Sequence, residues 1–548
     1  MALIRTTALA SALVLSLPLH AQVAPDAGRT LQETVPPVQA PRPSPDITIE
    51  PPSDAAVAPE GGVRVTLQSV GFSGNTVFDE ATLRAALGDV VGREFDLAGL
   101  RELAARVSAF YRSSGYPFAR AFLPAQAMRD GALRIEVIEG RYGQVRADGE
   151  ADLATGAQRF LVPLQTGDVI EGGALERTAL LLDDLPGVRA VPIIRPGQEL
   201  GTGDMIVRVE RERRYALEMG LDNHGNRYTG QGRARVNLGV DSPFMLGDQF
   251  LLRGLLTQEG MWFGHAGYSL PVGVSGLRAQ FAYAHTYYQL ERDFAALDAS
   301  GTAKTASAGL SYPLLRSQRA NVNLSVNLQY KDLNDRQGAT LSSSDKSSHA
   351  LPVTLGFDLR DGLGGGGMTY GALAWTPGRL DLDSGLAALD RTTARTEGGF
   401  SRYNLDVARL QLLPAGFNLF GRLSAQWASR NLDSSEGFGL GGPNGVRAYP
   451  VGEGYGDEGA LAQVELRWTH GALSPYGFYD IGRVRTDTRR WQAIDNSRSI
   501  SGAGFGLRAR DGGWNFDASF AWRLSGGAPE SDTKDRLPRV WVSAGYSF

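Results

Sequence analysis

The stretch that decides the fold is residues 321–330, which read NVNLSVNLQY. Apolar residues stand at every second position, and Asn, Ser or Gln fills the positions between them. This alternation predicts a β-strand with one apolar and one polar face. A tilted strand needs about 9–11 residues to cross a membrane, and this stretch has that length. It therefore fits a strand of a membrane barrel or a strand of a soluble sandwich.

The same pattern recurs throughout residues 213–548, for example at 417–427, while helical periodicity is absent. We count about sixteen such segments, an even number, as a closed single-chain barrel requires. Short connections such as 242–247 alternate with long ones such as 331–347, which is typical of periplasmic turns and outer loops. The sequence therefore predicts a 16-stranded transmembrane antiparallel β-barrel. A soluble sandwich is the alternative, but open sheets of this size are uncommon.

The composition agrees with this fold class. The 548 residues include 69 glycines, 42% hydrophobic and 21% charged residues, and only half of each barrel strand has to be apolar. The absence of cysteine excludes disulfides, thiolate zinc sites and iron–sulfur clusters. A net charge of −4 spread along the chain gives no basis for binding nucleic acid. Beyond the N-terminus there is no run of about 18 apolar residues, which argues against a helical membrane bundle.

The N-terminal residues predict export. Residues 1–21 combine a basic start at Arg5 with an apolar run and a small-residue cleavage site, the pattern of a secretory signal peptide. Residues 22–62 are rich in proline and alanine and predict a semi-extended linker. Within the linker, residues 26–33 can form a short helix capped by Asp26. Such a helix is marginal alone, so its order would have to come from packing against another part of the protein.

Two small α/β modules are expected between the linker and the barrel, at residues 63–140 and 141–212. In the first module we expect a strand at 63–67, a turn at 71–76, two helices and two further strands. The order of strand, helix, helix, strand and strand then recurs in the second module. Two copies of about 75 residues predict a tandem repeat of small domains.

The long loop at residues 429–456 carries the most specific motif of the chain, VRAY at its tip, and the later strand segment 478–482 reads FYDIG. Alternation along that strand places its first, third and fifth residues in the lumen. The residues of interest are Val446, Arg447 and Tyr449 on the loop and Phe478, Asp480 and Gly482 on the strand.

These motifs resemble those of the two-partner secretion transporters (TpsB type), the protein-exporting branch of the Omp85 superfamily. That family carries a Val-Arg-Gly-Tyr tip on its sixth outer loop and a Phe-x-Asp-x-Gly motif on a neighbouring strand. Ala448 departs from the family glycine. The segment GFSGNTVF at 71–78 resembles the opening of a first POTRA domain, and DLPGV at 184–188 resembles the middle of a second. The resemblance therefore implies two POTRA domains, at 63–140 and 141–212.

An arginine that enters a low-dielectric lumen needs a fixed carboxylate, and its planar guanidinium suits bidentate pairing. Asp480 is the partner of Arg447 that the resemblance implies. Glu465, which faces the lumen on the preceding strand beside Arg467, is the alternative acidic partner. An isolated loop arginine is usually solvated and contributes little, but the two matched motifs favour a buried pair here.

The resemblance implies a pore in the bacterial outer membrane, surrounded by outer-membrane lipid, with its POTRA domains in the periplasm. These domains would capture the N-terminal secretion domain of a large filamentous or β-helical partner protein, by pairing an edge strand with an extended segment. The pore would move that partner unfolded from the periplasm to the cell surface. The N-terminal helix and the loop at 429–456 would plug the resting pore. We expect a monomer without cofactor or metal.

Two other functions remain open at this stage. A barrel insertase shares the architecture, although such relatives usually carry more than two POTRA repeats. A barrel-embedded hydrolase would need a catalytic constellation, and neither Gly-x-Ser-x-Gly nor His-Glu-x-x-His occurs. The six histidines are scattered without obvious Ser or Asp companions: His20, His224, His265, His285, His349 and His470. We therefore expect no catalytic residues and no enzyme activity.

Overall fold

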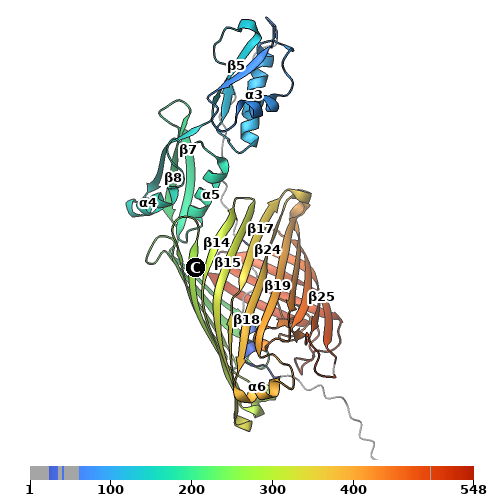
Figure 1. Cartoon of the computed structure of the whole chain (residues 1–548). Helices are drawn as coiled ribbons and strands as arrows, with labels where there is room; N and C mark the ends of the chain where they lie inside the picture. The colour runs from blue at the N-terminus through green and yellow to red at the C-terminus, as the bar shows by residue number, and fades with distance from the viewer. Residues whose placement is uncertain (1–23, 35–39, 42–60, 494) are drawn as a thin grey trace, which may run out of the picture.

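The computed structural model describes residues 24–34, 40–41, 61–493 and 495–548. The predicted signal peptide and most of the predicted linker lie outside these residues. Two small α/β domains stand at one end of a closed β-barrel (Figure 1). Among the described residues, no helix combines the length and the hydropathy needed to cross a membrane.

The first α/β domain is a three-stranded sheet with two helices. Its elements are β1 (Val65–Thr66), β2 (Ser69–Ser73), α2 (Glu80–Leu87), β3 (Glu94–Phe95), α3 (Leu97–Ser113), β4 (Arg120–Phe122), η1 (Arg129–Gly131) and β5 (Ala132–Ile138). Strand β5 lies in the middle, parallel to β2 and antiparallel to β4. Helix α3 carries Leu100, Leu103 and Val107 on one face, and all three are buried in the same core as Ile135 of β5.

The start of this domain differs from the prediction. Only Val65–Thr66 of the expected strand at 63–67 is extended, and it pairs with β3 rather than with the main sheet. The expected turn at 71–76 is in part β2, where Val70 and Phe72 point into the core. Because these two side chains are buried in the core, the segment that carries them is the one that joins the main sheet. The chain turns only at Gly74, whose φ of +80° favours glycine.

The second α/β domain repeats this topology. Its elements are β6 (Arg141–Gly149), α4 (Ala151–Gln158), η2 (Arg159–Leu161), α5 (Gly172–Asp183), β7 (Val188–Pro196) and β8 (Thr202–Arg211). The last strand, β8, lies in the middle, parallel to β6 and antiparallel to β7, as β5 lies between β2 and β4. The equal strand order and pairing directions show that the two domains are copies of one fold.

Glu139 joins the two domains at their boundary. Its carboxylate accepts hydrogen bonds from the backbone N–H groups of Thr76 (2.6 Å) and Val77 (2.8 Å) and from the Tyr111 hydroxyl (3.0 Å). It also pairs with Arg141 of the second domain at 3.2 Å. Burial by itself raises the pKa of Glu139, but these hydrogen bonds to the charged form outweigh burial and hold the pKa below its usual value.

The barrel confirms the predicted fold class. Its strand segments are β9 (Tyr215–Asp222), β10 (Arg233–Asp241), β11 (Gln249–Thr257), β12 (Trp262–Pro271), β13 (Arg278–Gln289), β14 (Ala299–Arg316), β15 (Ala320–Gln337), β16 (Ser342–Ala350), β17 (Val353–Asp361), β18 (Gly367–Leu382), β19 (Gly398–Leu412), β20 (Phe417–Ala428), β23 (Glu458–Trp468), β24 (Leu473–Arg485), β25 (Ser497–Asp511), β26 (Trp514–Ser525) and β27 (Arg539–Ser547). Neighbours pair antiparallel, and β27 pairs with β9 to close the cylinder, which leaves no exposed edge.

Segments β16 and β17 form one strand with an interruption at Leu351 and Pro352, because both pair with β15 on one side and β18 on the other. Proline has no N–H to donate to the ladder. Its carbonyl still accepts a hydrogen bond from the Asn327 N–H at 3.0 Å. The barrel therefore has sixteen strands.

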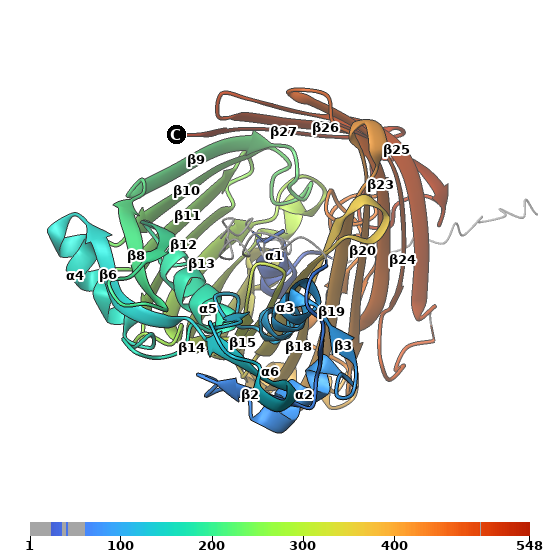
Figure 2. The same ribbon diagram turned by 90° about the horizontal axis from the view of Figure 1, so that it is seen from above.

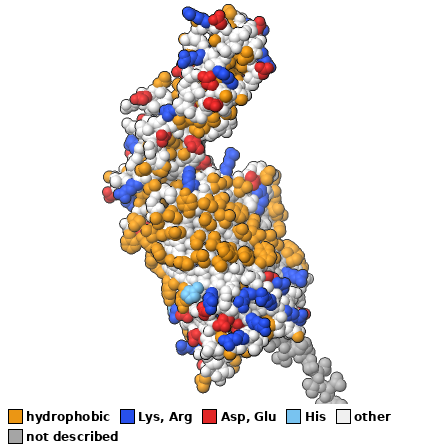
Figure 3. All heavy atoms as spheres, viewed as in Figure 1, with side chains coloured by type: hydrophobic (Ala, Val, Ile, Leu, Met, Phe, Trp, Pro, Cys, Tyr) orange, Lys and Arg blue, Asp and Glu red, His pale blue; other side chains and the backbone are white. Residues whose placement is uncertain are grey.

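The two faces of the strands have the predicted polarity. In β15, Val326, Leu328 and Tyr330 face outward and are exposed. Hydrophobic side chains gather in a belt across the face of the barrel that Figure 3 shows. A lipid environment imposes this arrangement, because apolar side chains face the hydrocarbon and polar ones face a wet lumen.

The prediction of a long loop at 331–347 is wrong in the length of the loop. Strand β15 continues to Gln337 and β16 begins at Ser342, so the strands remain paired beyond the membrane belt. Both faces of the wall can be polar there because water surrounds it. The short helices in the barrel connections are η3 (Arg292–Leu297), η4 (Gly338–Thr340), η5 (Leu363–Gly365), α6 (Ser384–Asp390) and η6 (Pro414–Gly416).

The second α/β domain docks on the turns at one end of the barrel. Arg316, at the end of β14, forms a bidentate pair with Asp184, with both N–O distances at 2.7 Å. The Ser242 hydroxyl donates to the Pro186 carbonyl at 2.7 Å. A Cβ at Gly187 would lie 3.1 Å from the Asp241 Cβ. The DLPGV segment at 184–188 thus contacts the barrel, as does α5, where Arg177 donates to the Pro313 carbonyl at 2.9 Å.

Candidate functional site

The connection between β20 and β23, residues 429–456, folds back into the lumen and is called loop 6 here. It begins with η7 (Ser434–Glu436), followed by the short paired strands β21 (Phe438–Gly439) and β22 (Tyr455–Gly456). The turn before its tip is tight, since a Cβ at Gly445 would lie 2.0 Å from the Leu440 carbonyl oxygen. The Val446 N–H donates to that same carbonyl at 2.7 Å. These contacts direct the tip toward the barrel wall.

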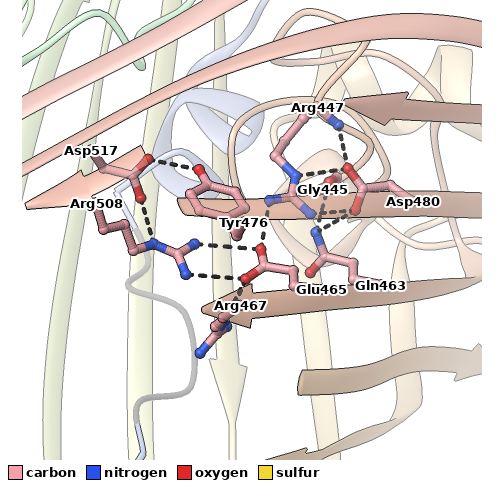
Figure 4. A network of polar contacts seen from close by, with 9 residues as sticks. All are labelled: Gly445, Arg447, Gln463, Glu465, Arg467, Tyr476, Asp480, Arg508 and Asp517. Carbon is pink, nitrogen blue, oxygen red and sulfur yellow. Dashed lines mark hydrogen bonds and ion pairs between the residues drawn. The ribbon is translucent and has the colours of Figure 1, made fainter. Parts of the chain in front are cut away.

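Arg447 at the tip is held by two carboxylates (Figure 4). Its Nε and Nη2 donate to Asp480 Oδ2 and Oδ1 at 2.8 and 2.6 Å, and its backbone N–H donates to Asp480 Oδ2 at 3.1 Å. Its Nη1 donates to Glu465 Oε1 at 2.6 Å. The Arg447 side chain is only 5% exposed. We call Arg447, Asp480 and Glu465 the arginine lock.

The aromatic member of the strand motif completes this contact. The Arg447 guanidinium carbon lies 3.6 Å from the ring centroid of Phe478, within the range of a cation–π interaction. Gly482, the last member of the motif, makes room for the loop, because a Cβ there would lie 2.7 Å from Leu440 Cδ2. Tyr479 and Ile481 point outward and are exposed, as alternation requires. Phe478, Asp480 and Gly482 thus contact loop 6.

A second layer of charges surrounds the arginine lock. Glu465 also pairs with Arg467 at 2.7 Å and with Arg508 at 3.1 Å, and Arg508 pairs with Asp517 at 2.8 Å. Three arginines therefore face three carboxylates, and the network is electrically balanced. Buried charges are tolerated when they are paired and hydrogen-bonded in this way.

Tyr449 and the tip backbone dock on the last strands of the barrel. The Tyr449 hydroxyl donates to the carbonyls of Ser525 (2.7 Å) and Gly527 (3.0 Å). Trp541 Nε1 of β27 donates to the Arg447 carbonyl at 2.8 Å. Val446 is fully buried in the cluster that joins the loop to the wall. The tip therefore contacts the strand that closes the barrel.

Ala448 fits because of its neighbour on the wall. A Cβ built on Gly502 of β25 would lie 2.4 Å from the Ala448 Cβ, so the methyl group occupies the space that a side chain at 502 would need. The departure from the family glycine is therefore compatible with a close approach. In this chain the glycine of the contact is Gly502 on the wall, and the residue at the tip is Ala448.

Helix α1 (Ala27–Gln32) lies inside the barrel (Figure 2). Asp26 caps it by accepting a hydrogen bond from the Arg29 N–H at 2.9 Å, as the sequence predicted. Ala27 and Leu31 are buried against wall residues such as Tyr288 and Leu333. The helix thus has the packing partner that its short length requires.

The helix also touches loop 6. The Ser434 hydroxyl of η7 donates to Asp26 Oδ2 at 2.6 Å, and Lys346 of the wall lies 2.9 Å from Asp433 and 3.6 Å from Asp26. A Cβ at Gly28 would lie 2.3 Å from Ser434 Oγ. The beginning of loop 6 therefore contacts the helix, while its tip contacts the wall.

The structure brings together the predicted residues Val446, Arg447, Tyr449, Phe478, Asp480, Gly482 and Glu465. Sequence reasoning missed Arg508, Asp517 and Trp541, whose positions depend on how distant strands are aligned. Arg508 and Asp517 could have been found as charged residues at lumen-facing positions of predicted strands. Among the described residues, no group of three or more His, Asp or Glu side chains could hold a metal ion.

Comparison with known proteins gives two family matches. Residues 201–509, more than half of the chain, match the model of the haemolysin secretion/activation proteins ShlB/FhaC/HecB. Residues 65–140 match the model of the ShlB-type POTRA domain.

Individual proteins agree with these matches. The heme/hemopexin transporter protein HuxB of Haemophilus influenzae (strain 86-028NP) is 27% identical over 477 residues, which cover 84% of this chain and 83% of the relative. The outer membrane transporter CdiB of Dickeya dadantii (strain 3937) is 25% identical over 417 residues, 74% of this chain and 72% of the relative. The solved structure of CdiB from Escherichia coli superposes with a TM-score of 0.74 at 22% identity, covering 92% of this chain and 94% of that one.

Proposed function

This chain belongs to the family of haemolysin secretion/activation proteins ShlB/FhaC/HecB, and on that premise we propose how it moves a secreted partner protein across the outer membrane. The barrel lies in the outer membrane and the POTRA domains lie in the periplasm. The named relatives are transporters. The observation that carries the proposal is that two segments of the chain outside the barrel wall, α1 and loop 6, occupy the lumen of the barrel.

In this proposal the two segments close the resting pore. Helix α1 has six residues and is held by side-chain contacts. The tip of loop 6 is held by the arginine lock, also through side chains. Such contacts can be released without breaking the hydrogen bonds between the barrel strands. Removal of a wall strand, in contrast, would expose an unpaired strand edge to lipid. Transport would therefore need movement of these segments, with the wall left intact.

A cavity of about 640 Å³ between the second POTRA domain and the barrel is the proposed entrance. Its lining includes Asp184, Arg316 and Arg278. Pro41, a described residue of the linker, lines it as well. In this proposal Pro41 lies beside the route that a partner would take from the periplasm.

The POTRA domains would capture the partner. In the first domain the outer edges of β2 and β4 have no strand partner within the described part of the chain, and the same holds for the outer edge of β7 in the second. An extended segment can add to such an edge through main-chain hydrogen bonds. We propose that the N-terminal secretion domain of a large filamentous or β-helical protein binds this way and that the partner crosses unfolded, through a monomeric transporter.

Secretion of a co-expressed partner tests this function. The probe is a large secreted protein whose gene lies beside that of this chain, expressed with the full-length transporter in a bacterium that lacks both. The partner should reach the cell surface only when the transporter is present. A variant that lacks residues 63–140 controls for the POTRA domains, and its barrel should insert without secreting. Insertion of unrelated barrel proteins by the chain, without secretion, would instead support an insertase.

A further inference from the structure

Five arginines gather where three outer connections leave the barrel wall. They are Arg379 on β18, Arg391 and Arg395 after α6, Arg430 at the start of loop 6 and Arg489 between β24 and β25. Arg430 donates to the carbonyls of Gly399 (3.2 Å) and Arg395, and Arg395 Nε donates to the Arg391 carbonyl at 3.1 Å. These contacts bring the chain segments of three of the arginines together.

A neighbouring asparagine links the remaining outer connection to this group. The Asn431 amide donates to the carbonyls of Ala394 (2.8 Å) and Arg489 (2.9 Å). Arg379 faces outward on β18, directly opposite Gly399. We call Arg379, Arg391, Arg395, Arg430 and Arg489 the rim cluster.

The rim cluster lacks the carboxylates that pair with arginines elsewhere in the barrel. Of the five arginines in the rim cluster, only Arg379 has an acidic partner among the described residues, Asp381 at 3.0 Å. Asp390 of the α6 connection is buried and accepts hydrogen bonds from the backbone N–H groups of Thr396 (2.8 Å) and Glu397 (3.0 Å). Four arginines on adjoining segments without an acidic partner leave an excess of positive charge at this end of the barrel, which an anion would offset.

The position of the cluster indicates which anion. Trp375, Tyr403 and Trp427 stand opposite one another on β18, β19 and β20, all facing outward and 45–50% exposed. Aromatic rows of this kind mark the boundary between hydrocarbon and headgroups. Arg379 stands four residues beyond Trp375 on the same face, roughly 13 Å along the strand. Arg379 therefore lies at headgroup level, on the side of the membrane away from the POTRA domains, and the contacts of Arg430 and Asn431 hold the segments of the other arginines at the same end of the barrel.

The surface view agrees with this placement. Lys and Arg side chains gather along the edge of the hydrophobic belt that is farther from the POTRA domains (Figure 3). The POTRA domains are periplasmic, so this edge meets the outer leaflet. A chain that passes through the lumen would not meet the outward-facing Arg379, which argues against an acidic segment of the secreted protein as the occupant.

We propose that the rim cluster binds the phosphate groups of the glycolipid that forms the outer leaflet. Guanidinium groups bind phosphate through paired N–H donors, which suits several arginines around a doubly phosphorylated headgroup. Arg430 stands at the start of loop 6. Bound lipid would therefore hold the outer end of this loop while its tip is free to move.

Native mass spectrometry of the purified full-length chain with diphosphoryl lipid A tests the proposal. In the triple variant Arg391→Gln/Arg395→Gln/Arg489→Gln, lipid binding should fall about tenfold or more, because each arginine near an anionic headgroup contributes substantially. The matched control Arg93→Gln/Arg101→Gln/Arg208→Gln removes three exposed arginines from the POTRA domains and should bind like the unchanged chain. If the triple variant fails to fold, Arg391→Gln and Arg489→Gln are measured singly and should each weaken binding.

The ligand series separates the possible occupants. Removal of both phosphates from lipid A should abolish the difference between the unchanged chain and the triple variant. Equal binding of diphosphoryl lipid A by both would overturn the proposal. So would occupancy by inorganic phosphate at the same concentration, or displacement of the lipid by an equal concentration of a polyglutamate peptide, since the site would then recognise a free anion or an acidic protein.

Discussion

Loop 6 and helix α1 both occupy the lumen, but they are held in different ways. Arg447 of loop 6 meets two carboxylates on neighbouring wall strands through four N–O contacts. Helix α1 rests on a small apolar surface and on single polar contacts. The Ala27 N–H donates to Asp335 Oδ1 at 2.8 Å, and Asp26 contacts Ser434 and Lys346. Its partner Ser434 belongs to loop 6, so part of its attachment is a segment that is itself held by the arginine lock.

This difference indicates an order of release. Breaking the contacts of α1 leaves Arg447 and its carboxylates in place. Release of the tip would leave buried charges without partners and would also free the beginning of the loop, on which α1 rests. We therefore expect α1 to leave at low cost and the tip to leave only with a large compensating interaction. The following predictions test whether the two attachments differ in this way.

Arg447→Ala should have the largest effect. The substitution leaves Asp480 and Glu465 without the cation between them, and breaking one side of a buried pair costs about 3–5 kcal/mol. We expect the tip to leave its site and secretion to fall strongly while the barrel still inserts, because β27 and β9 close the barrel by pairing with each other and no residue of loop 6 is part of that pairing. Secretion of the partner and heat-modifiable migration of the folded barrel are measured together.

Arg483→Ala is the matched control. Arg483 stands on the same strand as Asp480 but on the outer face, exposed and opposite Ala460. Its loss should leave secretion unchanged. Normal secretion by Arg447→Ala at normal barrel levels would show that the arginine lock has no part in transport.

Asp480→Asn and Glu465→Gln separate the two carboxylates of the lock. Asp480 accepts three of the four contacts from Arg447, so its neutralisation should weaken the tip by about 1.5–3 kcal/mol, the range for hydrogen bonds to charged groups. Glu465 is shared with Arg467 and Arg508. Its neutralisation should leave these two arginines with excess positive charge in the lumen.

Bilayer recordings distinguish these outcomes. Glu465→Gln should shift the reversal potential toward anion selectivity more than Asp480→Asn does, while Asp480→Asn should lower secretion more. Identical changes in both quantities would mean that the two carboxylates act as one unit.

Gly502→Ala tests the packing of the tip without changing any charge. Its new Cβ would lie 2.4 Å from the Ala448 Cβ, and overpacking of this kind costs about 1–3 kcal/mol. Secretion should fall as in Arg447→Ala, but less, and the resting conductance should rise because the displaced tip no longer fills its site in the lumen. The double variant Ala448→Gly/Gly502→Ala moves the methyl group from the tip to the wall and should restore both. A double variant as impaired as Gly502→Ala would contradict this account of Ala448.

Much of the barrel could be predicted because lipid on one side and water on the other impose a period of two on each strand, as in residues 321–330. The prediction failed where that constraint ends. Residues 331–337 remain paired in β15, but no difference between their two faces marks them as a strand. In the first POTRA domain, Gly71 lies between Val70 and Phe72. The prediction assigned Gly71 to a turn and therefore missed strand β2.

The arginine lock could be predicted in part because its motifs are local in the sequence. Local patterns also placed Asp480 and Glu465 on the lumen side of their strands. They could not show that Arg447 contacts both carboxylates, since this depends on the register between β23 and β24. The contact between Gly28 and Ser434 joins segments about four hundred residues apart, and no periodicity or motif relates them.

Asp26→Ala should have the smallest effect and tests the weaker side of the comparison. It removes the cap of α1, worth about 1 kcal/mol, and with it the contacts with Ser434 and Lys346. The open fraction of the resting pore should rise about fivefold in bilayer recordings, as 1 kcal/mol implies, while secretion is retained because the arginine lock is intact. Asp79→Ala removes the equivalent cap of α2 in the first POTRA domain, where Asp79 accepts from the Thr82 N–H at 2.8 Å, and should leave conductance unchanged. If Asp26→Ala instead abolished secretion as Arg447→Ala is expected to do, α1 and the tip would be released as a single unit, and the proposed order of release would be wrong.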